Sequence, residues 1–469
     1  MIPWNPAGLA TAIGARLSPE VNPGAVLTDV VIDSRLAGPG AVFVALAGQK
    51  ADGLDFVADA VAKGAPLAVV GQSVPGPIAL VDDPVAALGN LAELALRRAR
   101  VAARDMKVIG LTGSVGKTTT KDLLARITAT VGPTVAAEGS FNNHLGVPLT
   151  VVRADRDTAF VVVEMGANHE GEIAALARIA PPDVGVVLGV GKAHVGEFGS
   201  REAIARAKAE LLAGLMPNGA AVLNMDDPLV RAMAFGAPEN LITFGFDDMA
   251  RIRGLRRGLT AGGRLHLTIA DQDTRESARI ETGLVGRHLA VNVVAAVAAA
   301  AAAGIAVPAA AAALDGVTAV SPHRMALVDL PGGATVLDDS YNANPESVVA
   351  ALETLARLAK KAGRGAIAVL GEMRELGQEA AAEHTRIGRF AARQHLTRLV
   401  VVGRAAQNIA SGAASNGMAG KDIEFWPDVE GLADHLKSIA GQEFVLIKGS
   451  HGTDLWKVAD SLIGEDAQC

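Results

Sequence analysis

A glycine-rich run at residues 112–119 constrains the fold of this chain more than any other feature. It reads Thr-Gly-Ser-Val-Gly-Lys-Thr-Thr, and it lies between an apolar run at 108–111 and a helix-forming stretch at 121–126. A buried strand, a glycine-rich turn and a helix in this order wrap the phosphates of a nucleotide. Glycines let phosphate oxygens approach the backbone N–H groups, and the helix N-terminus adds positive potential. The run therefore predicts a P-loop.

Two side chains of this loop have expected roles. Lys117 would reach the β- and γ-phosphates, and the Thr118 hydroxyl would hold Mg²⁺. The usual spacing places a glycine where this chain has Leu111, so the pattern departs from the standard one by one residue. A glycine-rich turn that binds nothing is the alternative, and the strand–loop–helix context argues against it. The predicted nucleotide-binding residues of the loop are Gly113, Ser114, Val115, Gly116, Lys117, Thr118 and Thr119.

Length and composition limit the class of protein. A chain of 469 residues is expected to hold about three domains. The net charge of −7 argues against a nucleic-acid partner, and we interpret the basic cluster at 97–107 as the solvated face of a connecting helix. The single cysteine, Cys469, excludes a disulfide within the chain and fits a reducing cytosol, so we expect a cytoplasmic protein.

The sequence predicts no integral membrane segment. Residues 1–20 lack a basic leader followed by an apolar run, so no signal peptide is expected. The uncharged stretch at 293–314 is mostly alanine and is interrupted by Gly304 and Pro308. This pattern predicts a buried helix that ends at Gly304 and a second, short helix that starts near Pro308.

The chain divides into three parts, and the pattern predicts an α/β fold with domains at residues 1–103, 104–317 and 318–469. In the middle part, the apolar runs 160–164 and 184–188 are typical of a parallel sheet that is covered on both faces. The charged, glycine-rich segment 243–285 predicts a small antiparallel excursion. Strands are also predicted at 26–32, 41–46, 67–70, 335–339, 366–371, 399–403 and 444–448, with a helix at 56–63.

Polar residues at predicted strand ends are candidates for the chemistry, because ligands of open parallel sheets bind beyond the carboxyl ends of the strands. Glu164 ends its strand and could hold Mg²⁺ beside the P-loop. His194 follows the next strand. A loop histidine alone is more often a surface or hydrogen-bonding residue, but three converging strand ends favour a role in the site.

Lys208 is an anomaly in a predicted helix at 201–215. It lies four residues after Ile204 and three before Leu211, and therefore on the apolar face. A buried ammonium is costly unless it is paired or chemically altered. The pattern alone favours a snorkelling lysine, or one that pairs with Glu210 or Glu202.

Two further segments carry polar candidates. Residues 338–346 end a strand and begin a helix at Pro345, a typical first helical position. Their side chains lie at the carboxyl end of the strand, although Asn344 or Asp339 could serve only as a helix cap. Arg324, at the junction of the second and third parts, could reach across a cleft to a phosphate.

Together these motifs resemble one family, the Mur ligases, over nearly the whole chain. The matching segments are the loop at 112–119, the Asn-Asn-x-x-Gly-x-Pro run at 142–148, the motifs at 164–166, 193–200 and 207–210, the Asp-Asp-Ser-Tyr-Asn-Ala-Asn-Pro run at 338–345, the run at 369–377, and the amino-terminal segments 32–35 and 48–53.

The resemblance implies a small N-terminal α/β domain that binds a UDP-linked substrate, a central P-loop ATPase domain with a parallel sheet, and a C-terminal Rossmann-like domain. It implies ATP and two Mg²⁺ ions. Thr118 and Glu164 would hold one ion, and His194 and Lys208 the other. Lys117, Glu164, His194 and Lys208 would form the catalytic set. Lys208 would be carbamylated by CO₂, which turns the buried cation into an anion.

The resemblance also implies further contacts. Arg324 would meet the γ-phosphate, Asp339 the ribose, and Asn292 would belong to the nucleotide site. In the family His-Asn is common where this chain has His288-Leu289, which weakens an adenine contact there. The substrate-binding residues that the resemblance implies are Ser34, Arg35, Asn142, Asn143, Asn342 and Asn344.

Within the family, the run at 338–345 and the absence of Asp-Asn-Pro-Arg imply an enzyme that adds D-alanyl-D-alanine to UDP-N-acetylmuramoyl-tripeptide, through an acyl phosphate, in peptidoglycan precursor synthesis. A monomer is expected. One alternative is another ligase on this scaffold, either the enzyme that adds the third peptide residue or the one that adds glutamate to folate. The segment 33–35 argues against the folate enzyme. A nucleotide-dependent regulator is the other, and the set Lys117, Glu164, His194 and Lys208 argues against it.

Overall fold

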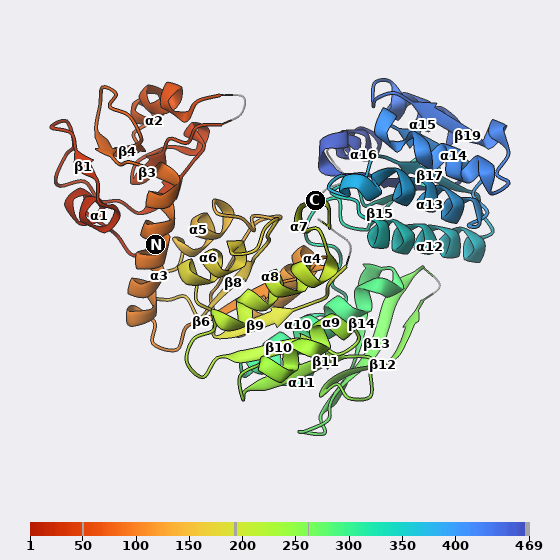
Figure 1. Cartoon of the computed structure of the whole chain (residues 1–469), viewed down its shortest axis with the longest axis horizontal. Coiled ribbons are helices and arrows are strands. Elements are labelled where there is room, and N and C mark those ends of the chain that lie inside the picture. Colours follow the sequence, from red (N-terminus) through yellow and green to blue (C-terminus); the bar gives the residue numbers. More distant parts are fainter. Residues whose placement is uncertain (49–50, 192–194, 261, 465–469) are drawn as a thin grey trace.

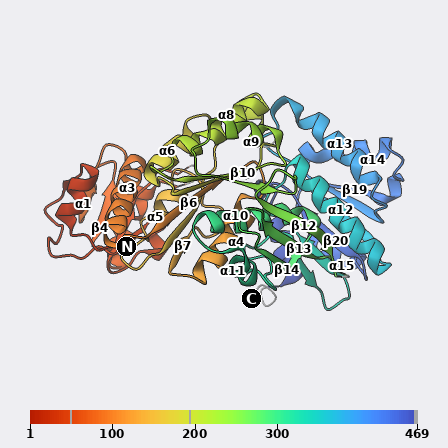
Figure 2. The same cartoon turned by 90° about the horizontal axis from the view of Figure 1, so that it is seen from below.

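The computed structural model describes residues 1–48, 51–191, 195–260 and 262–464. These residues form three α/β units, each built on its own sheet, and Figures 1 and 2 show them side by side, with the central unit in the middle. The predicted fold class, α/β with three domains and a central parallel-sheet P-loop unit, is confirmed.

The N-terminal sheet has the strand order β1-β5-β4-β3-β2, and only β1 runs antiparallel to its neighbour. The predicted strand at 67–70 is β4 without change of bounds, whereas the one at 26–32 shortens to β2. The elements are α1 (Pro6–Ile13), β1 (Arg16–Leu17), β2 (Asp29–Val31), η1 (Ser34–Leu36), β3 (Ala41–Val44), α2 (Val57–Ala62), β4 (Leu67–Val70), β5 (Ile78–Leu80) and α3 (Pro84–Ala102).

The central sheet has nine strands in the order β14-β13-β12-β11-β10-β9-β6-β8-β7. Its strands are β6 (Lys107–Thr112), β7 (Thr134–Ala136), β8 (Phe160–Glu164), β9 (Val184–Val187), β10 (Ala220–Asn224), β11 (Leu241–Gly245), β12 (Ile252–Leu259), β13 (Arg264–Asp271) and β14 (Ser277–Val285). The predicted antiparallel excursion is confirmed: β13 pairs antiparallel with β12 and β14, and this ribbon extends the parallel sheet.

Helices cover both faces of the parallel part of this sheet, as Figure 2 shows. Val108 and Ile109 are both fully buried but belong to different apolar clusters, because successive side chains of a strand point to opposite faces. This explains the continuous apolar runs. The helices are α4 (Lys117–Ala129), α5 (Gly146–Val151), α6 (Glu172–Ile179), α7 (Val195–Phe198), α8 (Arg201–Ala213), α9 (Pro228–Ala232), α10 (Ala290–Ala302) and α11 (Val307–Ala313).

The alanine-rich stretch forms two helices, as predicted. Helix α10 ends before Gly304, and α11 begins at Val307 with Pro308 in its first turn. Small side chains let α10 pack closely against α4 and the sheet, and its residues from Val293 to Ala300 are fully buried. No helix within the described ranges is both long and apolar enough to cross a membrane.

The C-terminal sheet has the order β15-β16-β20-β17-β18-β19, parallel except for β15. All four strands predicted for this part are present. The elements are β15 (Ala326–Asp329), β16 (Thr335–Asp338), α12 (Pro345–Ala362), β17 (Ala366–Leu370), η5 (Gly377–Glu379), α13 (Ala380–Ala392), β18 (Arg398–Val402), α14 (Gln407–Ser415), β19 (Ile423–Trp426), α15 (Leu432–Ile439), β20 (Phe444–Lys448) and α16 (Leu455–Ile463).

The basic cluster on α3 corrects one interpretation. Arg97 is exposed, but Arg98 places its guanidinium 4.0 Å from the centroid of the Trp4 ring, and Arg100 pairs with Asp183 at 3.0 Å. Arg100 also donates to the carbonyl of Pro181. The cluster is therefore not simply a solvated face, because two of its arginines tie α3 to the N-terminal segment and to the central unit.

Candidate active site

The P-loop joins β6 to α4, and Gly116 begins the helix with φ +82°, in the left-handed region that favours glycine. A Cβ at this position would lie 2.1 Å from the Asn292 amide nitrogen. That nitrogen donates to the Gly116 carbonyl at 2.9 Å. Asn292, from α10, thus holds the loop from behind, so Gly116 is required both by its backbone angle and by this neighbour.

Lys117 lies folded back over the loop, with Nζ donating to the Gly113 carbonyl at 2.8 Å. Burial lowers the pKa of Lys117, while the negative charge of Glu164 acts in the opposite direction. A phosphate placed in the loop would supply the anion that a buried ammonium needs. The geometry therefore suits the predicted role of Lys117 as a phosphate ligand.

Glu164 ends β8 and is 1% exposed. One carboxylate oxygen accepts from the Thr118 hydroxyl at 2.9 Å, and the other accepts from the Asn142 amide at 2.6 Å. The Ser140 hydroxyl lies 3.0 Å from that of Thr118. These are oxygen donors of the kind that Mg²⁺ prefers. Among the described residues no three His, Cys, Asp or Glu side chains gather to hold a metal.

Lys208, on α8, is 3% exposed and lies on the same buried face as Ile204 and Leu211. It is therefore not a snorkelling lysine. Glu210, one of its suggested partners, instead accepts from the backbone N–H groups of Gly171 and Ala174. Burial, reinforced by the charge of Lys117, lowers the pKa of Lys208 to about 7. Near neutral pH a large fraction of this amine is uncharged.

A cavity of about 740 Å³ lies beyond the P-loop, between the central and C-terminal units. Residues 114–119, Glu164, Asn142 and Asn292 line it from the central unit. From the C-terminal unit, the lining residues that the sequence predicted are Arg324, Asp339, Asn342 and Asn344. Residues far apart in the sequence thus meet at one nucleotide-sized hollow.

Arg324 reaches the P-loop from the linker between the two units. Its Nη2 donates to the Thr118 hydroxyl at 3.2 Å, and its guanidinium lies 4.1 Å from the centroid of the Tyr341 ring. Asp339 accepts from the buried Lys448 ammonium at 2.5 Å. Asn344 caps α12, as the capping alternative held, and it also lines the cavity.

Three residues predicted to bind the substrate do not line this cavity. Asn143 is exposed, and its side chain accepts from the backbone N–H groups that open α5. Ser34 and Arg35 lie in the N-terminal unit. The Arg35 guanidinium pairs with Asp33 and lowers the pKa of that carboxyl to about 2. His194 lies outside the described residues.

Sequence reasoning did not select several residues of the cavity, among them Lys448, Tyr341 and His288. Lys448 ends β20 and is buried against Asp339, a position that the strand-end argument would have identified. Tyr341 stacks under Arg324 from within a motif that was recognised. His288 lines the cavity, and burial lowers its pKa to about 4, so it is a neutral ring at physiological pH.

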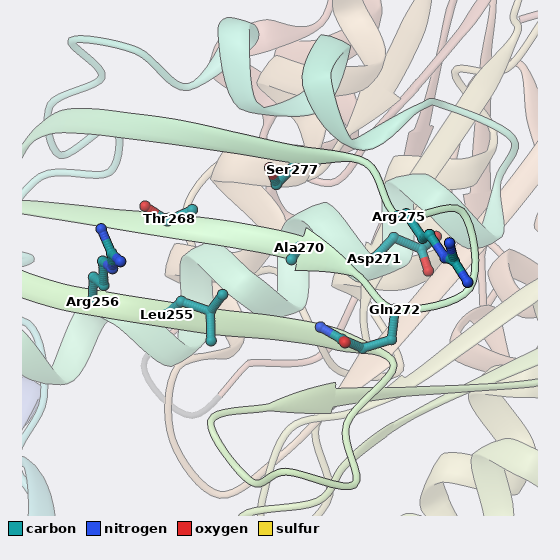
Figure 3. A pocket seen from close by; sticks show the side chains of 8 residues that line it. All are labelled: Leu255, Arg256, Thr268, Ala270, Asp271, Gln272, Arg275 and Ser277. Atoms are coloured by element: carbon teal, nitrogen blue, oxygen red, sulfur yellow. The ribbon is translucent and has the colours of Figure 1, made fainter.

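A smaller pocket, of about 400 Å³, lies on the antiparallel ribbon β12–β14 (Figure 3). None of its lining residues belongs to the P-loop or to the C-terminal unit. Its carboxylate, Asp271, is paired with Arg251 at 3.1 Å and accepts from the backbone N–H of Asp273. We therefore place the candidate active site in the larger cavity.

Comparison with known proteins identifies the family. The Mur ligase middle domain matches residues 111–300, the Mur ligase glutamate ligase domain matches 323–451, and the Mur ligase family catalytic domain matches 27–92. A UDP-N-acetylmuramoyl-tripeptide–D-alanyl-D-alanine ligase of Mycobacterium tuberculosis is 41% identical over 99% of both chains. One of Escherichia coli is 33% identical over 93% of this chain and 94% of the relative.

Solved structures give the same result. A crystal structure of MurF from Acinetobacter baumannii aligns with a TM-score of 0.85 and 29% identity, over 98% of this chain and 99% of the other. MurF from Thermotoga maritima in complex with ADP aligns with a TM-score of 0.77 and 28% identity, over 92% and 96%. The chain belongs to the Mur ligase family.

Proposed function

We propose that this protein is an ATP-dependent ligase that joins D-alanyl-D-alanine to UDP-N-acetylmuramoyl-tripeptide during synthesis of the peptidoglycan precursor. The observation that carries this proposal is the convergence of the P-loop, Glu164 and Arg324 on one cavity. Relatives named for this activity match the chain over 99% of its length and over 99% of their own.

Several residues of the cavity act in the first half of the reaction. The P-loop N–H groups and Lys117 bind the ATP phosphates, and Arg324 approaches the γ-phosphate from the other side. The terminal carboxylate of the tripeptide attacks that phosphate, which gives an acyl phosphate and ADP. Mg²⁺ would be held by Thr118 and Glu164, and a second ion by His194 and a carbamylated Lys208, where these ions neutralise charge on the phosphates.

The second half of the reaction forms the amide. The amine of D-alanyl-D-alanine attacks the acyl carbon, phosphate leaves, and the amine loses its proton. Acyl phosphates hydrolyse readily, so exclusion of water matters. The contact of Arg324 with Thr118, in a cavity that Asp339 also lines, supports closure of the C-terminal unit as the means of exclusion.

The surroundings of Lys208 support its carbamylation. The neutral amine adds CO₂ and releases one proton, which leaves a carbamate anion in place of a buried cation. A pKa of about 7 keeps the reactive neutral form available. Lys208→Ala is expected to be nearly inactive yet folded, because alanine suits a helix. Partial rescue by formate or acetate supports the carbamate, and full activity without any additive contradicts it.

The remaining assignments complete the proposal. Domains at 1–103, 104–317 and 318–469 would bind the UDP substrate, ATP and the incoming amine in that order. Ser34 and Arg35 would contact the UDP portion, and the muramoyl peptide and dipeptide would meet the asparagines at 142, 143, 342 and 344. We propose a cytoplasmic monomer with no nucleic-acid partner.

The test is phosphate release from ATP with UDP-muramoyl tripeptides that carry lysine or diaminopimelate at the third position, with and without D-alanyl-D-alanine. A ligase requires both acceptor and amine for full turnover. Selective use of D-alanyl-D-alanine over free lysine or diaminopimelate supports the proposal. Addition of a diamino acid to a muramoyl dipeptide would instead identify the ligase that adds the third residue, and ATP hydrolysis without either substrate would identify a regulator.

A further inference from the structure

The linker that carries Arg324 has an unusual backbone. On either side of the arginine, His323 has φ +58° and Met325 has φ +55°, both in the left-handed region. Residues with a Cβ avoid this region, and they persist there where the surroundings hold them. Arg324 therefore projects from a turn that its neighbours must maintain.

Both units hold the turn through side chains. On the central side, the Ser321 hydroxyl donates to Asp122 of α4 at 2.6 Å. On the C-terminal side, His323 Nδ1 lies 2.7 Å from a carboxylate oxygen of Asp338, the last residue of β16. The His323 and Asp338 side chains are only 12% and 4% exposed, so water competes little for this contact.

These contacts hold the turn and thereby place the Arg324 guanidinium. Arg324 lies over the Tyr341 ring and donates to Thr118, 206 positions earlier in the chain. The backbone N–H of Tyr341 donates to the His323 carbonyl at 3.3 Å, which fixes the ring relative to the turn. His323 thus contacts both the carboxylate that anchors it and the residue on which Arg324 rests.

We propose that His323 is a positioning residue that acts through Arg324: its hydrogen bond to Asp338 holds the left-handed turn that directs the guanidinium to the P-loop. The inference rests on the proposed function, in which Arg324 meets the γ-phosphate. The hydrogen bond to Asp338 raises the pKa of His323, and the groups that face the ring are Asp338, Asp460 and Arg324. The raised pKa favours a protonated His323 ring beside an ionised Asp338 carboxylate.

Two substitutions separate the hydrogen bond from the backbone angle. His323→Gly accepts the left-handed conformation without strain but deletes the contact with Asp338. His323→Asn also tolerates that conformation, with a shorter side chain. His435→Asn is the matched control. His435, on α15, makes a similar contact at 2.6 Å with Glu424, on β19. Each variant is assayed for kcat and for the KM of ATP and of both other substrates.

We expect both His323 variants to lower kcat about tenfold or more, since a small displacement of a catalytic group is costly. The control should stay within about twofold of the wild type. If His323 acts through Arg324, the double variant with Arg324→Ala is no slower than Arg324→Ala alone. If one His323 variant proves unstable, Asp338→Asn replaces it, because it weakens the same contact from the other side.

Two results would overturn the proposal. Wild-type kcat in His323→Gly would show that only the backbone angle matters. A double variant whose loss is the product of the two single losses would show that His323 acts independently of Arg324. Failure of the proposed function is distinct from both, because the wild type would then form no product from D-alanyl-D-alanine.

Discussion

At the scale of single residues, the candidate site contains two lysines whose surroundings disfavour the ammonium form. Lys117 and Lys208 both have lowered pKa values, in each case chiefly through burial, and the positive charge of Lys117 also bears on Lys208. Burial of two ammonium groups is unfavourable for folding. Lys117 has the Gly113 carbonyl as a hydrogen-bond acceptor, and a bound phosphate would add an anion. For Lys208, conversion to a carbamate would remove the positive charge.

Lys117→Ala tests the phosphate contact. Its removal takes away a charge that stabilises phosphoryl transfer, so turnover should fall by at least about a hundredfold. The measurement is kcat from coupled phosphate release, with circular dichroism as the control for folding. Turnover close to that of the wild type would contradict the P-loop assignment.

Lys208→Met tests the cost of burial. In bicarbonate-free buffer the unfolded chain keeps this proton up to pH 10.5, whereas the folded chain loses it above about pH 7. The unfolded state therefore binds more protons between these values, and wild-type stability rises with pH across that window. The Met variant should be more stable than the wild type at pH 7 and below, and its advantage should shrink toward pH 10. Urea unfolding at several pH values measures this, and a constant difference would refute it.

At the scale of elements, the sequence predicted whether a segment is a helix or a strand better than it predicted the first and last residues of that segment. Apolar runs such as 184–188 identified buried strands because both faces of the sheet are covered, and β9 is one residue shorter. The P-loop was predictable since its sequence and structure are contiguous. The pairs Arg324–Thr118 and Lys448–Asp339 were not, because they join residues more than 100 positions apart, and local pattern carries no information on such distances.

Helix α7 makes a contact between units that can be tested. The backbone N–H of Gly196 donates to the Glu375 carbonyl at 3.3 Å, and a Cβ at Gly196 would lie 2.6 Å from the backbone nitrogen of Gly377, the first residue of η5. Gly196→Ala should therefore hold the units apart and lower kcat by about tenfold.

The matched control for this helix is Gly236→Ala, where a Cβ would meet nothing within 4 Å. The two variants are compared by steady-state kinetics and by small-angle scattering with an ATP analogue and D-alanyl-D-alanine. Equal kcat values in both variants and the wild type would show that this close approach has no part in turnover.

At the scale of the whole molecule, the three units share their cores. One apolar cluster includes Leu9 of α1 and Val161 of β8, and another includes Val293 of α10 and Leu358 of α12. The cavity, by contrast, is lined within the described chain only by residues of the central and C-terminal units. Nucleotide binding should therefore stabilise two of the three units directly.

Hydrogen exchange with a non-hydrolysable ATP analogue tests this division. At a hundredfold excess over its Kd, the analogue should stabilise the folded state that binds it by about 2.7 kcal/mol. Protection should rise in β6, α4 and β16 and change little in β2, β3 and β4. Equal added protection in the N-terminal sheet would contradict the expectation and indicate coupling through α3.

The contact between Arg324 and Thr118 makes the linker a tether as well as a support. Two groups 206 positions apart lie 3.2 Å from each other, and the linker keeps both on one chain. A short connection keeps such partners at an effective concentration on the order of millimolar. A single proteolytic cut between residues 317 and 320 would turn this encounter into a bimolecular one. The nicked enzyme would then behave as a heterodimer, whose specific activity falls on dilution and returns on concentration.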